Sequence, residues 1–366
     1  MTLCVDLSNF QEFKPKTMEV LLYTLAIVIT IISFIPLIKN DYWTFRVFEF
    51  PRVQKLILTF LVTAAVIYFC KPSDEKNLIL LALTGTIIYL FKQIIPYTPL
   101  GKKQILKAMY VNRENNLKLM ISNVFEENTH YDECLKEIKK ADPDVVLLLE
   151  TNKVWERETS MLEIDYPFFV KKPLNNTYGM LLYSRFPLHN SEVKFMVEHD
   201  IPSIHTQVEL PSGQLIQLYC LHPTPPVPNE NPRSTERDKE LLIIAEMSKD
   251  HPLPVIVCGD MNDVAWSYTT ELFLKISGLL DPRRGRGMIN TFHAHYPIMR
   301  FPLDHVFCST DFKLVKLKRL SNFQSDHFPI FIQVQFEKNA EEEQEGQKLE
   351  ADQADKQEAR EKVNKI

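Results

Sequence analysis

Glycine is scarce in this sequence of 366 residues, which holds nine glycines against 23 prolines. A glycine-rich loop lets the backbone approach a phosphate closely, because glycine has no side chain to obstruct it. The pattern GxxxxGK followed by Ser or Thr does not occur. The sequence therefore disfavours a nucleotide-binding loop of the P-loop kind.

Cysteine pairs with zinc-site spacing are also missing, since none of the six cysteines forms a CxxC pattern. Cys220, Cys258 and Cys308 lie inside apolar, strand-like runs, where a thiol behaves as a small hydrophobic group. We expect buried free thiols and a reducing compartment. The serine-hydrolase pattern GxSxG does not occur in the sequence.

An excess of positive charge is lacking, because the net charge is −5. From Glu337 onward the chain holds ten acidic and six basic residues, so the rest is close to neutral. A large surface that binds any nucleic acid sequence needs many unpaired Lys and Arg residues. The composition therefore disfavours such a surface, although it does not exclude a local basic patch.

Long uncharged runs are present near the amino terminus. Val20–Ile38 contains nineteen residues without a charge, enough to cross a bilayer core of roughly 30 Å at about 1.5 Å per residue. No small-x-small cleavage site follows it, as a secretory signal would require. We expect a membrane-spanning helix, and a buried core helix is the alternative.

Two shorter uncharged runs follow, Leu56–Cys70 and Leu78–Phe91, joined by the polar turn KPSDEKN. Each is long enough to span only if Lys55 and Lys92 extend to the interfaces. We expect a membrane hairpin, with an interfacial or re-entrant hairpin as the alternative. Residues 1–100 are therefore predicted to be a multi-pass membrane region with spans near 20–38, 56–70 and 78–91.

The basic residues that flank these runs predict an orientation, because Lys and Arg accumulate on the cytoplasmic side. The larger group comprises Lys39, Arg46, Arg52, Lys55, Lys92, Lys102, Lys103 and Lys107. The smaller group comprises Lys14, Lys16, Lys71 and Lys76. The excess predicts that the amino terminus is outside and that the large carboxy-terminal domain is cytoplasmic.

Residues 101–336 show short apolar strands alternating with helices and turns, which predicts one α/β domain with a large sheet core. Expected strands include LKLMISNV, DVVLLLE, GMLLYS, LIQLYCL, PVIVCG, LDHVFCS and PIFIQVQF. Helical periodicity covers 132–141 and 236–249. The remainder, 337–366, is charged and poor in large apolar residues, so we expect a disordered tail, with a solvated helix as the alternative.

Polar residues recur where these apolar runs begin or end. They are Asn123, Glu150, His222, Asp260, Asp304 with His305, and Asp326 with His327. One such residue means little, since Asp beside a strand is ordinary turn chemistry. Six coincidences in one domain are harder to dismiss, because enzymes built on sheets place reactive groups at strand ends.

These residue types form a usable chemical set. Carboxylate and amide oxygens suit a hard divalent cation such as Mg²⁺ or Mn²⁺. A histidine paired with an aspartate can donate a proton or polarise a phosphoryl oxygen, and a further aspartate can take a proton from water. Together they predict hydrolysis of a phosphate ester by metal-assisted in-line attack.

The order Asn123, Glu150, YGMLLYSRFPL, LHPTPP, GDMN, PLDHVF and SDHFP resembles the endonuclease/exonuclease/phosphatase superfamily. The resemblance covers roughly Leu117–Gln335 and implies the DNase I-like fold, a four-layered α/β sandwich. The three amino-terminal segments, DVAWS and DPRRGRG look like the membrane-anchored bacterial branch of that superfamily.

The resemblance also implies roles for individual residues. Glu150 is expected to be the principal metal ligand, with Asn123 beside it and Asp326 close by. The remaining five are expected to be catalytic. Asp260 activates or orients water, Asn262 is its partner on the phosphate, His327 contacts the scissile phosphate, Asp304 orients His327, and His222 is a second phosphate or proton-transfer contact. Weaker candidates are Asp263, Arg185, Arg300 and His305.

One position departs from some nuclease branches, which carry an acidic residue two positions after the strand-end Asn. This chain has Phe125 there, so a single-metal site is expected. The predicted function is a membrane-anchored Mg²⁺- or Mn²⁺-dependent phosphoesterase acting on nucleic acid or a phospholipid headgroup. The alternative is a non-catalytic membrane scaffold or binding protein on the same fold. No protein partner is readable, and a transporter is disfavoured because the spans hold no charged groups.

Overall fold

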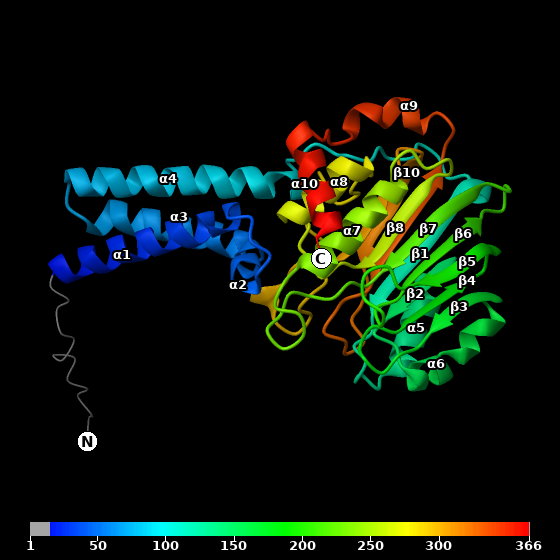
Figure 1. Ribbon diagram of the computed structural model, residues 1–366. Coiled ribbons are helices and arrows are strands. Elements are labelled where there is room, and N and C mark those ends of the chain that lie inside the picture. The colour runs from blue at the N-terminus through cyan, green and yellow to red at the C-terminus, as the bar shows by residue number, and fades with distance from the viewer. Residues whose placement is uncertain (1–14, 366) are drawn as a thin grey trace, which may run out of the picture. The chain divides into compact units, whose positions relative to one another are not determined.

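The computed structural model describes residues 15–365 and divides the chain into two compact units. The first holds the long apolar helices; the second comprises Asn40–Phe50 and Ile95–Ile366 (Figure 1). The predicted boundary near residue 100 therefore omits one piece of the second unit. The stretch between the first and second long helices belongs to it, because buried ion pairs and backbone hydrogen bonds hold it there.

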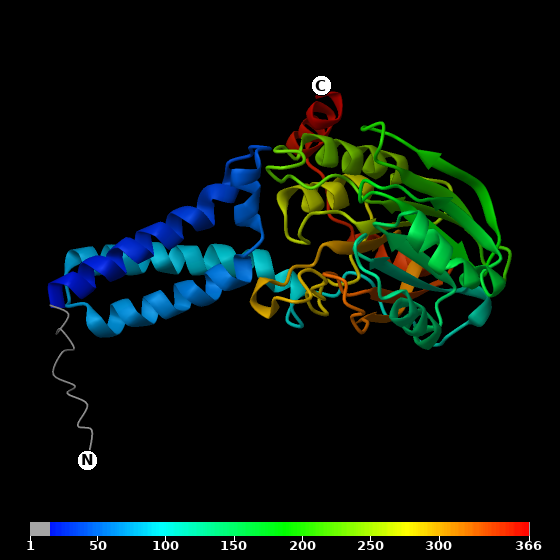
Figure 2. The same ribbon diagram turned by 90° about the horizontal axis from the view of Figure 1, so that it is seen from below.

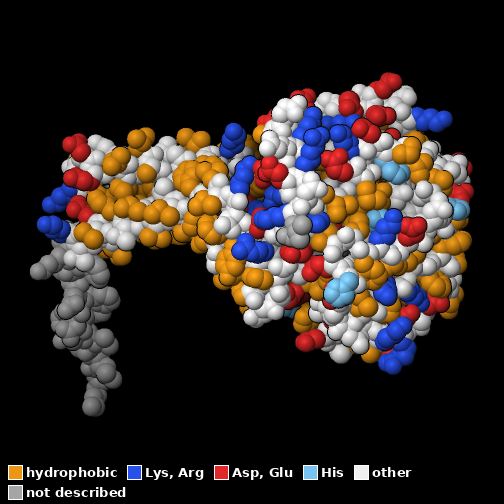
Figure 3. All heavy atoms as spheres, viewed as in Figure 1, with side chains coloured by type: hydrophobic (Ala, Val, Ile, Leu, Met, Phe, Trp, Pro, Cys, Tyr) orange, Lys and Arg blue, Asp and Glu red, His pale blue; other side chains and the backbone are white. Residues whose placement is uncertain are grey.

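The first unit is a group of three helices, α1, α3 and α4, that pack on one another. Their bounds are Pro15–Phe34, Arg52–Phe69 and Asp74–Ile94. In the described part of the chain these three are long and apolar enough to cross a membrane, by length and composition. Their outward surfaces are rich in hydrophobic side chains (Figure 3), among them Val20, Leu61 and Leu81, each more than half exposed.

The second unit is built on two packed sheets. The six-stranded sheet has the order β10-β11-β1-β2-β4-β3 and the five-stranded sheet the order β5-β6-β7-β8-β9. The pairs β1–β2 and β7–β8 are parallel, and the other pairs are antiparallel. The strands of the first sheet are β1 Asn116–Asn123, β2 Val145–Leu149, β3 Phe168–Lys172, β4 Met180–Ser184, β10 Phe312–Arg319 and β11 Ile330–Phe336. Those of the second are β5 Leu188–Lys194, β6 Ser203–Glu209, β7 Leu215–Leu221, β8 Val255–Asp260 and β9 Asp304–Cys308.

Helices cover the outer face of each sheet (Figures 1 and 2). Apolar residues of α5 (Tyr131–Ala141) and α6 (Lys153–Glu158) pack on the first sheet. Those of α7 (Thr235–Ser248) and α8 (Tyr268–Ser277) pack on the second. A third cluster of buried side chains fills the space between the sheets. The predicted four-layered α/β sandwich is therefore confirmed.

Alternation of side chains across each strand explains the layers, because successive residues point to opposite faces. In β1, Leu119 and Ile121 join the core between the sheets, whereas Met120 packs under α5. Shorter helical pieces complete the chain: α2 Trp43–Arg46, α9 Ala340–Gln344, η2 Ile35–Leu37, η3 Val47–Glu49, η4 Ile95–Tyr97, η5 Arg113–Asn115, η6 Ser160–Ile164, η7 Pro297–Met299 and η8 Glu345–Gln347.

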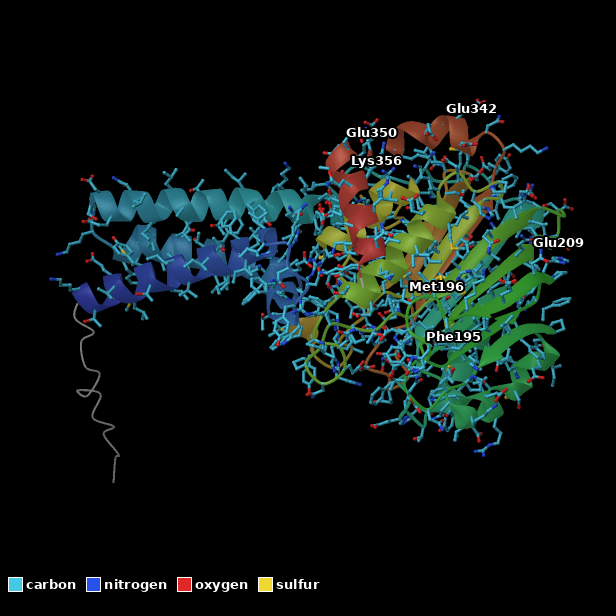
Figure 4. All side chains as sticks on the ribbon, viewed as in Figure 1. Phe195, Met196, Glu209, Glu342, Glu350 and Lys356 are labelled. Carbon is cyan, nitrogen blue, oxygen red and sulfur yellow. The ribbon has the colours of Figure 1, made fainter. Side chains whose placement is uncertain are left out.

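The charged carboxy-terminal segment is folded, so the predicted disorder is wrong for the residues described. Its last helix, α10 (Gln353–Asn364), begins with a capping box at Asp352 and packs against α7 and α8. Ala359 is 1% exposed in the same cluster as the apolar face of α7. Glu350 lies just before α10 and Lys356 in its first part (Figure 4). A few small apolar contacts and ion pairs on one face suffice to dock it.

The expectation of buried free thiols holds where the structure describes it: Cys70, Cys134, Cys220, Cys258 and Cys308 are free and buried. Cys4 lies outside the described residues.

Candidate active site

The candidate site lies where several strand ends meet at one edge of the two sheets. The parallel strands β1 and β2 end at Asn123 and just before Glu150, and β8 ends at Asp260. Asp304 starts β9 and pairs with Asp260 in antiparallel register. Because antiparallel neighbours place the start of one strand beside the end of the other, residues far apart in sequence share this edge.

Hydrogen bonds of Asn123 link the two sheets. Its Nδ2 donates to Glu150 Oε1 at 2.6 Å and to Asp260 Oδ2 at 3.1 Å. Its Oδ1 accepts from the backbone N–H of Phe125 at 3.1 Å. Asn123 thus holds two carboxylates from different sheets against one amide group.

His327 lies between two carboxylates. Its Nδ1 is 2.8 Å from Asp304 Oδ2, and its Nε2 is 3.5 Å from Asp260 Oδ2. Burial alone would lower the pKa of His327, but Asp304 and Asp260 together raise it to about 10. The imidazole is therefore cationic at neutral pH, and Nε2 presents an N–H toward the centre of the site.

His222 and Asn262 complete the group around Asp260. His222 Nε2 lies 4.0 Å from Asp260 Oδ2, and burial lowers the pKa of this histidine to about 4. The backbone N–H of Asn262 donates to Asp260 Oδ1, and its Nδ2 donates to Pro223 O, both at 2.9 Å. The two histidines therefore differ in charge, since His222 is neutral and His327 is cationic.

The site holds buried carboxylate oxygens that lack a hydrogen-bond partner among the described residues. Burial, with Asp326 and Asp260 nearby, raises the pKa of Glu150 to about 7 despite the hydrogen bond from Asn123. The buried Oδ1 atoms of Asp304 and Asp326 have no hydrogen-bond partner among the described residues. A bound divalent cation would coordinate such unpartnered carboxylate oxygens and would lower the pKa of Glu150.

The residues present fit a divalent cation. Glu150 and Asp326 offer carboxylate oxygens, the type that Mg²⁺ and Mn²⁺ prefer. Asn123 would offer its amide oxygen to the cation only after a turn of the amide group by about 180°. Such a turn exchanges the positions of oxygen and nitrogen and leaves the shape of the side chain unchanged. Asp260, Asp304 and His327 also have ligand-type atoms within 4.8 Å of one another. Because Asp304 already binds His327 Nδ1, we interpret that second group as acid–base machinery.

All eight predicted site residues are thus found in one place, but the weaker candidates divide. His305 is buried, contacts Arg283 through Nδ1 and the carbonyl of Asp263 through Nε2, and so supports the loop after β8. Asp263 accepts from Ser267 Oγ at 2.6 Å. Arg185 pairs with Asp142 at the opposite end of β2. It lies away from the site, in the surface ion pair that is ordinary for an arginine.

Arg300 lies close to the site without entering it. Its Nη2 donates to the carbonyl of Ala294 at 2.8 Å, and its guanidinium stacks 5.0 Å from the centre of the Phe328 ring. Phe328 directly follows His327 in the chain. The arginine braces the loop before β9 rather than reaching the carboxylates.

Supporting residues that the sequence did not indicate surround His327. Ser325 Oγ donates to the carbonyl of Asn123 at 2.8 Å and accepts from the N–H of His327. The ring of Phe292 lies 4.9 Å from the imidazole of His327, and Thr291 Oγ1 accepts from the N–H of Asp304. The Tyr178 ring lies 5.1 Å from that of His222. Ordinary Ser, Thr and aromatic residues carry no pattern that would reveal these contacts.

The position of Phe125 agrees with a missing carboxylate in the metal shell. The next residue, Glu126, turns its side chain away: its carboxylate accepts from Thr177 N at 2.7 Å and Asn152 Nδ2 at 3.3 Å. Phe125, Glu150 and Asn262 all have left-handed backbone conformations. Such non-glycine residues cost of order 1–3 kcal/mol each and cluster at functional sites.

Gly259 sets the close approach of β7 and β8 beside Asp260. A Cβ atom at this position would lie 1.9 Å from the carbonyl oxygen of Leu221, and the φ angle is +141°. Only glycine fits both the space and the backbone angle. The chain can therefore bring Asp260 next to His222, which follows Leu221.

A two-sheet α/β sandwich with carboxylates, amides and a His–Asp pair at one edge defines a phosphoesterase-like class of protein. A profile of the Endonuclease/Exonuclease/phosphatase family matches residues 120–327. The chain belongs to this family. No curated protein matches the sequence.

Solved structures share the fold at low sequence identity. TDP2 of D. rerio, in complex with a single-strand DNA product, is 19% identical, with a TM-score of 0.51 over 60% of this chain and 98% of its own. An endonuclease/exonuclease/phosphatase from Beutenbergia cavernae is 17% identical, with a TM-score of 0.50 over 61% and 72%. A protein of unknown function from Enterococcus faecalis is 13% identical, with a TM-score of 0.50 over 60% and 100%.

Proposed function

We propose that the protein is a membrane-anchored, divalent-metal-dependent phosphoesterase that cleaves phosphodiester bonds of nucleic acid or a phospholipid headgroup. The observation that carries this proposal is the convergence of Glu150, Asn123 and Asp260 with the His327–Asp304 pair at one edge of the sandwich. Acidic groups beside a fixed cation form a site that can receive a phosphate and activate water next to it.

The roles of the residues follow from their contacts. Glu150 and Asp326, with Asn123, would hold Mg²⁺ or Mn²⁺, which when bound supplies neutralising charge for the phosphate oxygens. Asp260 accepts a proton from the attacking water, and Asn262 is fixed beside it by the Pro223 carbonyl. His327 donates its Nε2–H to a phosphoryl oxygen, while Asp304 holds Nδ1. His222, neutral, offers a second hydrogen-bonding contact.

The membrane anchor is proposed from the three long apolar helices. Asn40–Phe50 follows α1 and shares a compact unit with the chain from Ile95 onward. If α3 and α4 form a spanning hairpin, these two pieces emerge on the same face, as the proposal requires. Flanking Lys and Arg residues favour the cytoplasmic face of an inner membrane.

The substrate class rests on chemistry that both alternatives share. D. rerio TDP2 has been solved with a single-strand DNA product, which favours nucleic acid. The proposed membrane anchor would place phospholipid headgroups near the site, which favours a phospholipid substrate. A phosphodiester is common to the two.

The test is hydrolysis of bis-p-nitrophenyl phosphate by the full chain in detergent, with Mg²⁺, Mn²⁺ or EDTA. Metal-dependent turnover is expected in the wild type and lost in Glu150→Gln and His327→Ala. Matched controls are Glu163→Gln and His189→Ala, whose partners are Lys171 and Glu209 at the surface. Parallel assays with single-stranded DNA and with phospholipid vesicles separate the two substrates. A folded, metal-loaded wild type that cleaves none of these favours the scaffold alternative.

A further inference from the structure

The segment Asn40–Phe50 joins α1 to α3, yet it is part of the unit that carries the site. It lies outside the residues matched by the family profile, 120–327. Its short helix α2 is followed by the turn η3.

Backbone and side-chain bonds fix the segment to the start of α7. Trp43 N donates to Pro232 O at 2.9 Å, and Ser234 N donates to Asp41 O at 2.8 Å. The buried Arg46 donates from Nη2 to Asp238 Oδ2 at 2.9 Å and from Nε to Ser234 Oγ at 3.2 Å. Segment 40–50 is therefore hydrogen-bonded to the residues just before α7 and to its first turn.

Asp238 passes this contact on to a second arginine. Arg237, 1% exposed, donates from Nη2 to Asp238 Oδ1 at 3.0 Å. From Nη1 it donates to the backbone carbonyl of Asn262 at 2.7 Å. The Asp238 carboxylate thus binds Arg46 through Oδ2 and Arg237 through Oδ1. Arg237 in turn binds the backbone of Asn262, in the loop that follows Asp260.

Glu49, at the end of the same segment, reaches the other end of that loop. Its carbonyl accepts from Trp266 Nε1 at 2.9 Å, and its Oε1 accepts from the N–H of Tyr268 at 3.2 Å. Tyr268 is the first residue of α8. Segment 40–50 therefore contacts the end of the loop directly through Glu49, and reaches its start indirectly, through Arg46, Asp238 and Arg237.

The charges in this network are buried together and compensate one another. Burial would raise the pKa of Asp238, but Arg46, Lys362 and Arg237 hold it well below its usual range. Removing Arg46 takes away one of the three cations around Asp238 and leaves Ser234 and Asp238 to find other partners. Because buried charged groups pay heavily for lost partners, the side chains that remain are expected to shift.

We propose that Arg237 is a positioning residue for Asn262, and that segment 40–50 holds Arg237 in place through Arg46 and Asp238. This inference rests on the proposed roles of Asp260 and Asn262. The loop between the first two long helices is then a working part of the active-site support. Full activity requires that this loop be joined to the catalytic unit.

The first test is steady-state kinetics on the full chain in detergent, with bis-p-nitrophenyl phosphate and Mg²⁺. Arg237→Gln and Arg46→Gln are each expected to lower kcat about 10- to 100-fold with KM changed less than about twofold, because the loop with Asp260 and Asn262 shifts while Glu150, Asp326 and His327 keep their places. Arg46→Lys keeps the charge and is expected to recover most of the loss. Arg185→Gln, in a surface ion pair away from the site, is the matched control.

The double variant Arg46→Gln/Arg237→Gln separates a coupled network from two independent defects. If Arg46 acts through Arg237, the double variant loses no more activity than Arg237→Gln alone. Losses that multiply, or that appear in KM alone, overturn the inference. Each variant is assayed well below its melting temperature, with kcat expressed per folded molecule.

Hydrogen–deuterium exchange tests the same coupling without any turnover, and so separates failure of this inference from failure of the proposed function. Arg46→Gln is expected to speed exchange of the peptide covering residues 260–267, while the Arg185→Gln control leaves it unchanged. Unchanged exchange of that peptide in Arg46→Gln overturns the inference, whether or not the wild type hydrolyses phosphate esters.

Discussion

His327 and Asp304 join the two sheets at the candidate site: Nδ1 of the histidine donates to Oδ2 of the aspartate at 2.8 Å. His327 precedes β11 in the first sheet, and Asp304 begins β9 in the second. The pair fixes which imidazole nitrogen faces Asp260 and keeps the ring charged. Any shift between the sheets would change this contact, so the chemistry depends on the packing of the whole sandwich.

Replacing Asp304 by Asn is expected to lower kcat by about 10²- to 10⁴-fold, the range over which general acid–base groups contribute. The amide cannot stabilise the charged imidazole, and it can offer Nδ1 a donor in place of an acceptor. Phosphodiester hydrolysis by the full chain measures the effect. Asp142→Asn is the control, because Asp142 lies in a surface ion pair and asparagine tolerates its left-handed backbone. Equal activity in Asp304→Asn and wild type would contradict the assigned role.

Mg²⁺ is expected to stabilise the folded protein, by about 2.7 kcal/mol at a hundredfold excess over its Kd. Glu150→Gln removes the principal ligand, so the rise in melting temperature on adding Mg²⁺ is expected to disappear. Glu126→Gln is expected to keep it, because the carboxylate of Glu126 is bound to Thr177 and Asn152. Loss of the shift in Glu126→Gln instead would show that this carboxylate belongs to the metal shell.

Glu240, which lies outside the candidate site, is expected to make the stability of the folded protein depend on pH. Burial, with Glu198 nearby, raises the pKa of Glu240 to about 8, whereas an unfolded Glu titrates near 4.3. Between these values the folded state keeps a proton that the unfolded state has released. The free energy of unfolding therefore falls as pH rises, by at most about 1.4 kcal/mol per pH unit.

Melting temperatures of wild type and Glu240→Gln, measured from pH 5 to pH 8, test this expectation. The variant has no carboxyl to ionise, so its advantage over the wild type is expected to grow with pH. A constant difference across the range would show that Glu240 is already ionised in the folded protein.

Gly259→Ala is expected to destabilise the protein by about 3 kcal/mol or more, because the new Cβ would overlap the Leu221 carbonyl and the φ angle is unfavourable for alanine. Thermal unfolding of the full chain measures it. Gly346→Ala is the control, since nothing lies within 4 Å of a Cβ there. A melting temperature as high as that of the control would mean that β7 and β8 can separate at little cost.

The carboxy-terminal helix is expected to stabilise the catalytic unit. Ala359→Asp places a carboxylate in a fully packed apolar cluster, so the free energy of unfolding is expected to fall by roughly 2–4 kcal/mol. Ala354→Asp changes an exposed position on the same helix and is expected to have little effect. If the two variants melt alike, α10 is not docked in solution.

The sequence predicted the central strands because they are buried on both faces and read as continuous apolar runs. β2, β7 and β8 are of this kind. It did not predict β3, β5, β6 and β10, which combine apolar residues with charged or polar ones. Three of these four are edge strands, whose pairing depends on a neighbour that the local sequence does not contain.

The eight candidate site residues could be named from the sequence because seven of them lie where an apolar run begins or ends, and because their order, with Asn262 in GDMN, resembles a family. The fold class, the apolar spans and the available side-chain chemistry can therefore be read from the residues alone. The contacts among Glu150, Asn123 and Asp260, the different environments of His222 and His327, and the docking of segment 40–50 and the tail cannot be read that way. Those features depend on distance and desolvation, which arise when separate strands and helices pack together.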